Sequence, residues 1–172
     1  MTEKFRETLP AAEGAGRRET PGVLIREAEE RDVPEIAALE KRCFSDAWSE
    51  TSVMGTLKSP LGYVLIAERT DGEGFDLPCG YLIAQVFDGE GELLRIAAAP
   101  EARRRGTGRA LLERMLEDHP DVSVWRLDVR TKNAAAIALY EKYGFRIVTE
   151  NPDAYKDPRD NGYLMIRTAE TR

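Results

Sequence analysis

The sequence contains few of the side chains that bind metals or form disulfides. Its single histidine is His119, and its two cysteines, Cys43 and Cys79, lie in unrelated segments without C-x-x-C or Cys/His spacing. This pattern indicates neither a zinc site nor a disulfide framework, so we expect no metal and two reduced, buried thiols. His119 precedes Pro120 at a predicted helix end, where compensation of the helix dipole explains it, and we assign it no catalytic role.

Long apolar runs and an excess of positive charge are also missing. No segment approaches the roughly 20 apolar residues of a membrane-spanning helix. Residues 1–22 lack the apolar core of a signal peptide, so we expect a cytoplasmic protein with no membrane partner. The 31 acidic and 25 basic residues give a net charge of -6, which argues against nucleic acid as a partner. Any site for an anion must therefore be local.

Length and composition predict one domain. The chain has 172 residues, of which 42% are hydrophobic, enough for a single core. Residues 1–21 are rich in Glu, Arg, Gly, Ala and Pro without an apolar period, which is typical of a flexible N-terminal arm. The folded domain is therefore expected to span residues 22–172.

Hydrophobic periodicity predicts an α/β domain of mixed strands and helices. Asp32 is expected to cap the first helix, and Pro60 to end the second. Helices are expected at 33–43, within 49–60, at 107–118 and within 133–144; strands are expected at 23–28, 62–69, 79–88, 92–100, 122–129, 145–150 and 162–168, with a turn at 89–91 and a polar loop at 151–161. The order implies early antiparallel strands, followed by one crossover helix between the strands that begin at 92 and 122.

The stretch "EARRRGTGRALLERML" at 101–116 predicts a local anion site. A helix start leaves N–H groups unpaired and carries a partial positive charge, and Gly106 and Gly108 let the preceding backbone curl around an anion. Amides from about residue 104 to 109 could bind a pyrophosphate while the arginine side chains neutralise it. The alternative is a basic turn that leads into a solvated helix face. A nucleic-acid patch is disfavoured because no aromatic residues alternate with the arginines.

A second motif, "NAAAIALYEKYGF" at 133–145, places Asn133 and Tyr140 two turns apart on one helix face. An amide and a phenol so placed could contact one extended ligand. The alternative is that Asn133 only caps the helix and Tyr140 is a core aromatic.

Together these segments resemble the GNAT superfamily of N-acetyltransferases, whose acyl-CoA loop reads Q/R-x-x-G-x-G/A. With "NPDAYKDPRDNGYLM", the likeness extends to its ribosomal-protein-alanine N-acetyltransferases. The resemblance implies the GNAT fold, with a central mixed sheet of six to seven strands flanked by about four helices. It implies transfer of acetyl from acetyl-CoA to a primary amine, the N-terminal α-amine of a protein such as a ribosomal protein. A small-molecule amine acetyltransferase and a non-catalytic acyl-CoA-binding module are the alternatives.

The resemblance also implies the residues that bind the cosubstrate. Backbone groups of the "IAA" segment would pair with the pantetheine arm as an added strand does, the basic loop would hold the pyrophosphate, and the second motif would contact the arm. These residues are Ile96, Ala97, Ala98, Arg103, Arg104, Arg105, Gly106, Thr107, Gly108, Arg109, Asn133 and Tyr140.

For catalysis, Tyr140 matches the family tyrosine that protonates the departing sulfur, because an exposed phenol with a pKa of about 10 stays protonated at neutral pH. Asp128 in "LDVR" stands where the family has a glutamate base. It is one methylene shorter, so we expect it to act through a water. The alternative is a structural pair with Arg126 or Arg130. Glu92 is the competing base, and its alternative is a solvated charge at a strand end.

The acceptor segments depart from the family pattern. "CFSDAWSE" resembles F-x-x-P-W-S with Ala47 in place of proline, and Trp48 with Tyr155 would frame the acceptor channel. Ala154 replaces a second family tyrosine. The identity of the acceptor and the oligomeric state remain open at this point.

Overall fold

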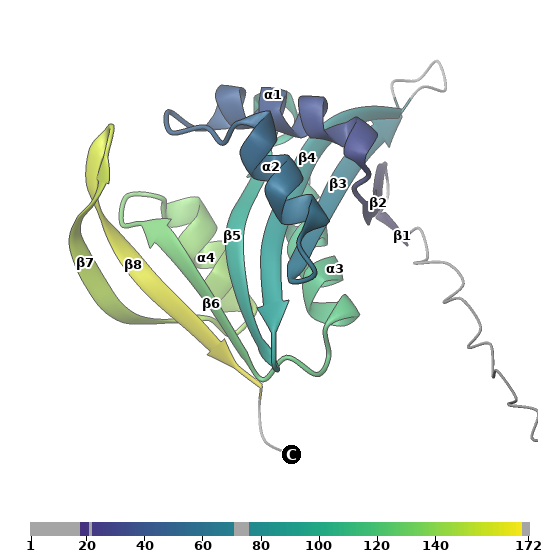
Figure 1. Ribbon diagram of the computed structural model, residues 1–172. Helices are drawn as coiled ribbons and strands as arrows, with labels where there is room; N and C mark the ends of the chain where they lie inside the picture. Colours follow the sequence, from purple (N-terminus) through teal and green to yellow (C-terminus); the bar gives the residue numbers. More distant parts are fainter. Residues whose placement is uncertain (1–17, 21, 71–75, 170–172) are drawn as a thin grey trace, which may run out of the picture.

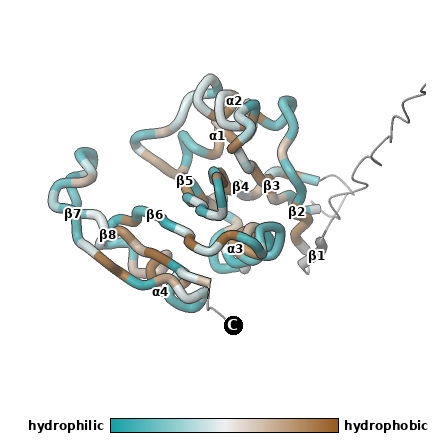
Figure 2. The backbone as a smooth tube through the Cα atoms, turned by 60° about the horizontal axis from the view of Figure 1, so that its bottom comes forward, coloured by the Kyte–Doolittle hydropathy of each residue, from teal (hydrophilic) through white to brown (hydrophobic). Residues whose placement is uncertain are grey.

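The computed structural model describes residues 18–20, 22–70 and 76–169, which form one mixed β-sheet with two helices on each face (Figures 1 and 2). The strands are β1 (Arg18–Thr20), β2 (Val23–Glu27), β3 (Gly62–Thr70), β4 (Asp76–Phe87), β5 (Glu90–Ala98), β6 (Val124–Arg130), β7 (Arg146–Lys156) and β8 (Arg159–Thr168). The helices are α1 (Val33–Cys43), α2 (Glu50–Lys58), α3 (Thr107–Asp118) and α4 (Ala134–Lys142), with short 3-10 turns η1 (Glu30–Asp32) and η2 (Pro100–Ala102).

The sheet order is β1-β2-β3-β4-β5-β6-β8-β7, and β5 and β6 form its one parallel pair. Helix α3 makes the crossover between them, as predicted. The expected six to seven strands are present, together with the three-residue strand β1, which pairs with β2. Strand β1 lies within the predicted flexible arm, so residues 18–20 correct that prediction. Residues 1–17 and 21 of the arm lie outside the described residues.

Two of the predicted connections differ from the structure. The turn before β5 consists of Asp88 and Gly89, both with positive φ, so β5 begins at Glu90 and not after 91. The predicted polar loop at 151–161 is wrong, because β7 and β8 continue as a long hairpin. Every residue of β7 except Tyr155 is exposed, so this strand shows no alternation of buried and exposed residues that a sequence pattern could reveal.

The core lies between the sheet and the helices on both faces. Trp125, Tyr81 and Phe145 are among the largest fully buried side chains. Leu111 and Leu112 of α3 are also fully buried, as expected from the apolar stripe of that helix. Helices α1 and α2 cover one face, and α3 and α4 cover the other (Figure 2).

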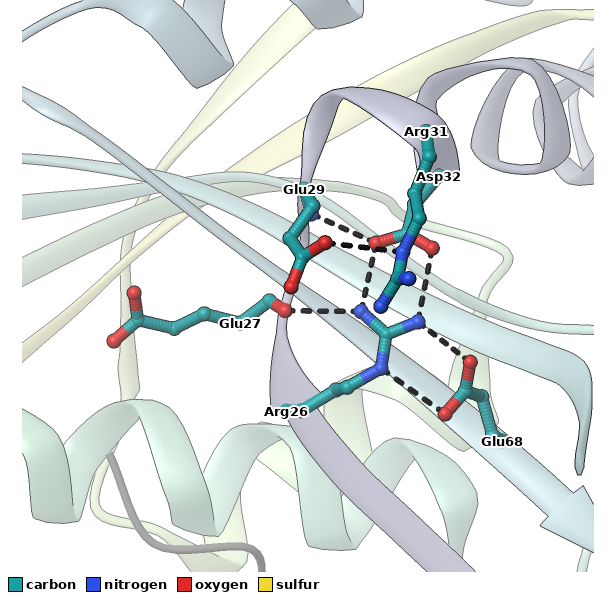
Figure 3. A network of polar contacts seen from close by, with 6 residues as sticks. All are labelled: Arg26, Glu27, Glu29, Arg31, Asp32 and Glu68. Atoms are coloured by element: carbon teal, nitrogen blue, oxygen red, sulfur yellow. Dashed lines mark hydrogen bonds and ion pairs between the residues drawn. The ribbon is translucent and has the colours of Figure 1, made fainter. Parts of the chain in front are cut away.

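A polar network fixes the start of α1 against the sheet (Figure 3). The guanidinium of Arg26 in β2 donates to Asp32 at 2.7 and 2.9 Å and to Glu68 of β3 at 2.6 and 3.1 Å. Asp32 also accepts the N–H of Glu29 at 2.7 Å. It was expected to cap α1, but its side chain makes no capping bond to that helix. The Arg26 hydrogen bonds lower the pKa of Asp32 below its ordinary value.

Strands β5 and β6 separate halfway along their length. Their pairing runs from Glu90 opposite Val124 to Leu93 opposite Leu127 and ends there, although β5 continues to Ala98. On its other side, β5 has a bulge at this point, because Leu94 has no partner in β4. A bulge bends and twists its strand, so the two strands diverge and leave a gap in the sheet. Figure 1 shows this divergence.

Candidate active site

The gap between β5 and β6 is a cavity of about 410 Å³. It is lined by residues of both strands, of α4 and of segments that approach from either end of the sheet. These residues are Phe44, Asp46, Glu92, Leu93, Leu94, Arg95, Ile96, Ala97, Ala98, Gly108, Leu127, Asp128, Val129, Arg130, Asn133, Ala136, Leu139, Tyr140 and Tyr155. All three predicted catalytic residues are among them.

Tyr140 lies on α4 and is 5% exposed, so it is not the exposed phenol that the sequence suggested. Its ring packs against Phe145, with 5.8 Å between the centroids. Burial, and to a lesser extent the charge of Tyr155, raise the pKa of Tyr140 well above its ordinary value. The phenol therefore stays protonated across the neutral range, and for a stronger reason than exposure would give.

Asp128 is exposed on β6 and has no hydrogen-bond or ion-pair partner in the described part of the chain. The alternative pairing of Asp128 with Arg126 or Arg130 is not formed, since Arg126 binds Glu90 at 2.6 Å and Arg130 donates to backbone carbonyls. Glu92 is also exposed and lies opposite Arg126 in the parallel register. Both carboxylates are accessible from the cavity.

The two faces of the sheet divide the cavity lining into two sets. Arg95 is opposite Ile83 and Glu92 is opposite Gln85, so both point to the face covered by α1. Alternation along β6 places Asp128 and Arg130 on that same face. Tyr140 approaches from α4 on the opposite face. The carboxylates and the phenol therefore point into the gap from opposite faces of the sheet.

The β5 backbone beyond Leu93 has no strand beside it on the β6 side. Ile96, Ala97 and Ala98 line the cavity here, as predicted for the residues beside a pantetheine arm. The small alanine side chains let a ligand approach the backbone closely. This free strand edge can take an extended ligand with amide groups.

The basic loop ends in a turn at the start of α3, where the sequence predicted an anion site. Gly106 is the N-cap residue in the left-handed region, with φ of 81°, and Arg104 also has positive φ. The first intrahelical bond runs from the N–H of Ala110 to Gly106, so the N–H groups of residues 107–109 have no helical partner. Of this loop only Gly108 lines the cavity, so the amides lie at its mouth.

The loop side chains make local contacts. Arg103 donates to the carbonyl of Ala98 at 3.4 Å, and Arg109 lies 3.6 Å from Glu113. Thr107 is buried and donates to the carbonyl of Ala102, which leaves only its backbone N–H for a ligand. Arg103, Arg104, Arg105 and Arg109 are exposed.

Asn133 caps α4 and lines the cavity. Its side-chain oxygen accepts the N–H of Ala136 at 3.2 Å, as the capping alternative predicted. The turn before it is held by Asp160, a buried carboxylate that accepts from Thr131 and from the N–H of Asn161, both at 2.8 Å. The hydrogen bonds to Thr131, Lys132 and Asn161 outweigh desolvation and lower the pKa of Asp160.

The two predicted acceptor residues differ in position. Tyr155 lines the cavity, and the Arg130 guanidinium lies 4.2 Å from its ring centroid. Trp48 is outside the lining, and its ring centroid lies 5.6 Å from the Arg95 guanidinium. Phe44 and Asp46 line the cavity from the α1–α2 segment instead.

A buried ion pair beneath this segment was missed from the sequence. Glu40 of α1 is fully buried and accepts from Arg95 at 3.1 and 2.8 Å, from the N–H of Trp48 at 2.9 Å and from the hydroxyl of Tyr81. Burial and Glu40 raise the pKa of Tyr81 far above its ordinary value. One signal was present, because Glu40 falls within the apolar stripe of its helix.

The expectations about cysteine, histidine and membrane segments have mixed outcomes. Cys79 is buried and Cys43 only partly buried, and both are free thiols. Burial lowers the pKa of His119, which disfavours the charged form that dipole compensation requires. Over the described ranges, no cluster of three potential metal-binding side chains is found. Nor does that part of the chain contain a helix long and apolar enough to span a membrane.

Comparison with known proteins gives one consistent result. The family model described as Acetyltransferase (GNAT) family matches residues 27–145. The ribosomal protein bS18-alanine N-acetyltransferase of Salmonella typhimurium is 38% identical over 127 residues, 72% of this chain and 81% of that protein. The Escherichia coli K12 enzyme of the same description is 35% identical over 148 residues, which are 82% of this chain and 94% of that protein. The crystal structure of the ribosomal-protein-S18-alanine N-acetyltransferase from Escherichia coli superposes with a TM-score of 0.77, 29% identity, and coverage of 87% of this chain and 96% of that one.

Proposed function

The chain belongs to the GNAT family of acetyltransferases, and from this premise we propose that it transfers acetyl from acetyl-CoA to the N-terminal α-amine of a protein. One observation carries the proposal. One cavity, at the gap between β5 and β6, is lined by a buried phenol, two accessible carboxylates and a free strand edge. A ribosomal protein with N-terminal alanine is the acceptor suggested by the similar bS18-alanine enzymes.

The residues present fit acetyl-CoA. The free edge of β5 can pair with the amides of the pantetheine arm, and the unpaired N–H groups at the start of α3 can bind the pyrophosphate. Asn133, which lines the cavity between these two places, can contact the arm. The exposed arginines of the loop would screen the phosphate charge and contribute less than the backbone.

In the proposed reaction the neutral amine attacks the acetyl carbonyl carbon, a C–N bond forms, and the C–S bond breaks. Tyr140 donates its phenolic proton to the departing sulfur. The amine proton passes, through water, to Asp128 or Glu92 on the opposite face of the sheet. No covalent enzyme intermediate is needed, because the amine attacks the thioester directly. One proton is lost by nitrogen and one is gained by sulfur, and exchange with solvent then returns the proton to Tyr140 and removes it from the carboxylate.

The acceptor face of the cavity is acidic. Glu92 and Asp128 line it without an ion-pair partner among the described residues. Asp46 also lines it and lies 3.7 Å from Arg95, which is paired as well with the buried Glu40. This arrangement favours a cationic N-terminus over an anionic substrate. We further propose that the enzyme works in the cytoplasm, where such N-termini are made, without a metal and without nucleic-acid or membrane partners.

The acceptor class is tested by acetyl transfer to a panel of amines. Peptides that begin with alanine and continue with a basic ribosomal sequence should be acetylated, and the same peptides with a blocked N-terminus but a free lysine should not. Free polyamines and amino acids test the small-molecule alternative. CoA binding without transfer to any amine would refute the enzyme proposal and leave an acyl-CoA-binding module.

The base is tested by comparing the pH–rate profiles of Asp128→Asn and Glu92→Gln. The variant that lacks the base should lose the ascending limb of kcat/KM, and the other variant should keep it. If both keep it, solvent accepts the proton and neither carboxylate has the proposed role.

A further inference from the structure

Two segments from opposite ends of the sheet meet over the cavity. The first, which we call the α1–α2 lip, comprises residues 44–48; the second, the hairpin lip, comprises residues 155–159 at the β7–β8 turn. The hydroxyl of Ser45 donates to the carbonyl of Asp157, 112 positions along the chain. In Figure 1 the loop that leaves α1 extends toward the β7–β8 hairpin.

Arg95 of β5 holds the α1–α2 lip. Its guanidinium donates to the carbonyl of Asp46 at 2.8 Å, lies 3.7 Å from the Asp46 carboxylate, and stacks 4.3 Å from the ring centroid of Phe44. Arg95 is itself fixed from below by the fully buried Glu40, which also accepts the N–H of Trp48. The α1–α2 lip is therefore attached to a guanidinium that is itself held by a buried carboxylate.

Arg130 of β6 holds the hairpin lip with the same chemistry. Its two terminal nitrogens donate to the carbonyls of Pro158 at 2.6 Å and Asp157 at 3.0 Å, and its guanidinium lies over the ring of Tyr155. Each lip is thus held by main-chain carbonyl contacts and an aromatic stack on one planar guanidinium. Lysine cannot reproduce this combination, because its ammonium is neither planar nor forked.

The two lips differ in packing, because Phe44 and Trp48 of the α1–α2 lip lie partly buried against the hydrophobic core and no residue of the hairpin lip does. The Asp46 side chain is 59% exposed, and the hairpin lip is exposed except for the half-buried Tyr155. Pairing of β7 with β8 is irregular just before this lip, between Asn151 and Tyr155. Segments with few buried apolar contacts open easily, so the Arg130 contacts and the Ser45 hydrogen bond position the hairpin lip. In the α1–α2 lip, the Arg95 contacts add to the packing of Phe44 and Trp48.

Both arginines line the cavity, on the face that also carries the two candidate bases. We propose that Arg95 and Arg130 are positioning residues for the acceptor, acting through Asp46 and Tyr155, and that they set the width of the acceptor mouth. The proposal rests on the proposed function. It separates two roles at the gap: the free edge of β5 takes the cosubstrate, and the arginines of β5 and β6 shape the site for the amine.

The test is steady-state kinetics of Arg95→Lys and Arg130→Lys with the peptide that the wild type acetylates. The KM for the peptide should rise about tenfold or more, because charge-assisted contacts are lost. The dissociation constant of acetyl-CoA and kcat at saturating peptide should change little. Arg31→Met is the matched control, since Arg31 forms an exposed ion pair with Glu29 outside the cavity lining, and it should change none of these values.

Amide hydrogen exchange gives a second measurement that does not depend on turnover. Exchange should become faster in residues 44–48 for Arg95→Lys and in residues 155–159 for Arg130→Lys, while the cores of β4 and α3 stay protected. If the variants are active and their peptide KM is unchanged, the positioning role of the arginines is overturned and the proposed function stands. A parallel loss of acetyl-CoA binding and core protection would also overturn the positioning role, because it indicates a structural one. A wild type that acetylates no N-terminus would overturn the proposed function, and this proposal with it.

Discussion

Replacing Tyr140 with phenylalanine tests the catalytic assignment with the least disturbance to the fold. The substitution removes one oxygen and keeps a ring that is 95% buried by its own helix and by Phe145, because Tyr140 is 5% exposed. Among the described residues no hydrogen bond to the lost hydroxyl is found, and its oxygen is not among the buried polar atoms left without a partner, which fits its place in the cavity lining. Stability should therefore change by less than about 1 kcal/mol.

The rate should respond much more strongly. General acid catalysis contributes a factor of about 10² to 10⁴, which is about 2.7–5.5 kcal/mol in the barrier. The raised pKa of Tyr140 also predicts the pH dependence of kcat in the wild type. Because the phenol stays protonated, kcat should not fall through loss of the acid at any pH below about 10.

The assay follows release of the free CoA thiol at saturating acetyl-CoA and peptide, with CoA affinity measured by calorimetry and folding by thermal denaturation. We expect kcat to fall at least about a hundredfold, with the CoA dissociation constant within about threefold of the wild type. A Tyr140→Phe variant that retains more than a third of kcat would refute the general-acid role. Joint loss of CoA affinity and folding would show that Tyr140 is only a core aromatic.

Further predictions concern the loop, the buried ion pair and alkaline pH. Gly106→Ala should cost about 1–2 kcal/mol of stability through its φ of 81° alone, because no atom lies within 4 Å of the added Cβ. Gly108→Ala should cost no stability, because its added Cβ meets only Leu139 at 3.8 Å. Thermal denaturation checks both, and glutamate at either glycine should abolish CoA binding in calorimetry. Glu40→Gln leaves a buried guanidinium without its charge partner and should lower the free energy of unfolding by about 3–5 kcal/mol in urea titrations; a loss below 1 kcal/mol would contradict the ion-pair reasoning. Burial raises the pKa of Tyr63 and Tyr81 in the folded state, so their contribution is complete below about pH 10 and is lost as the pH rises further; a urea midpoint that stays constant from pH 9 to 11 would contradict this.

The sequence predicted the helices best where periodicity and end signals agree. The limits of α1 and α3 match those expected, 33–43 and 107–118. Both helices bury one apolar stripe and expose the rest, so their period is visible in the residues themselves. The continuation of the β7–β8 hairpin through 151–161 was missed because every residue of β7 except Tyr155 is exposed, and such a strand leaves no alternation to detect.

The candidate site was predicted through its motifs and missed where it depends on long-range pairing. Asn133 and Tyr140 line the cavity as expected from their spacing. The burial of Tyr140 depends on Phe145 and the sheet, which periodicity could not place. Arg95 pairs with Glu40 across 55 positions, and a charged residue in an apolar pattern does not indicate its partner.

The bulge at Leu94 also has a kinetic consequence. It inverts the alternation of β5, so that Glu92 and Arg95, three residues apart, point to the same face. With regular pairing Arg95 would turn toward α3 and the cosubstrate. We expect the two substrates of the proposed reaction to reach the gap from opposite faces of the sheet, so that both are bound when acetyl is transferred. Double-reciprocal plots at several acetyl-CoA concentrations should therefore intersect, as expected for a ternary complex.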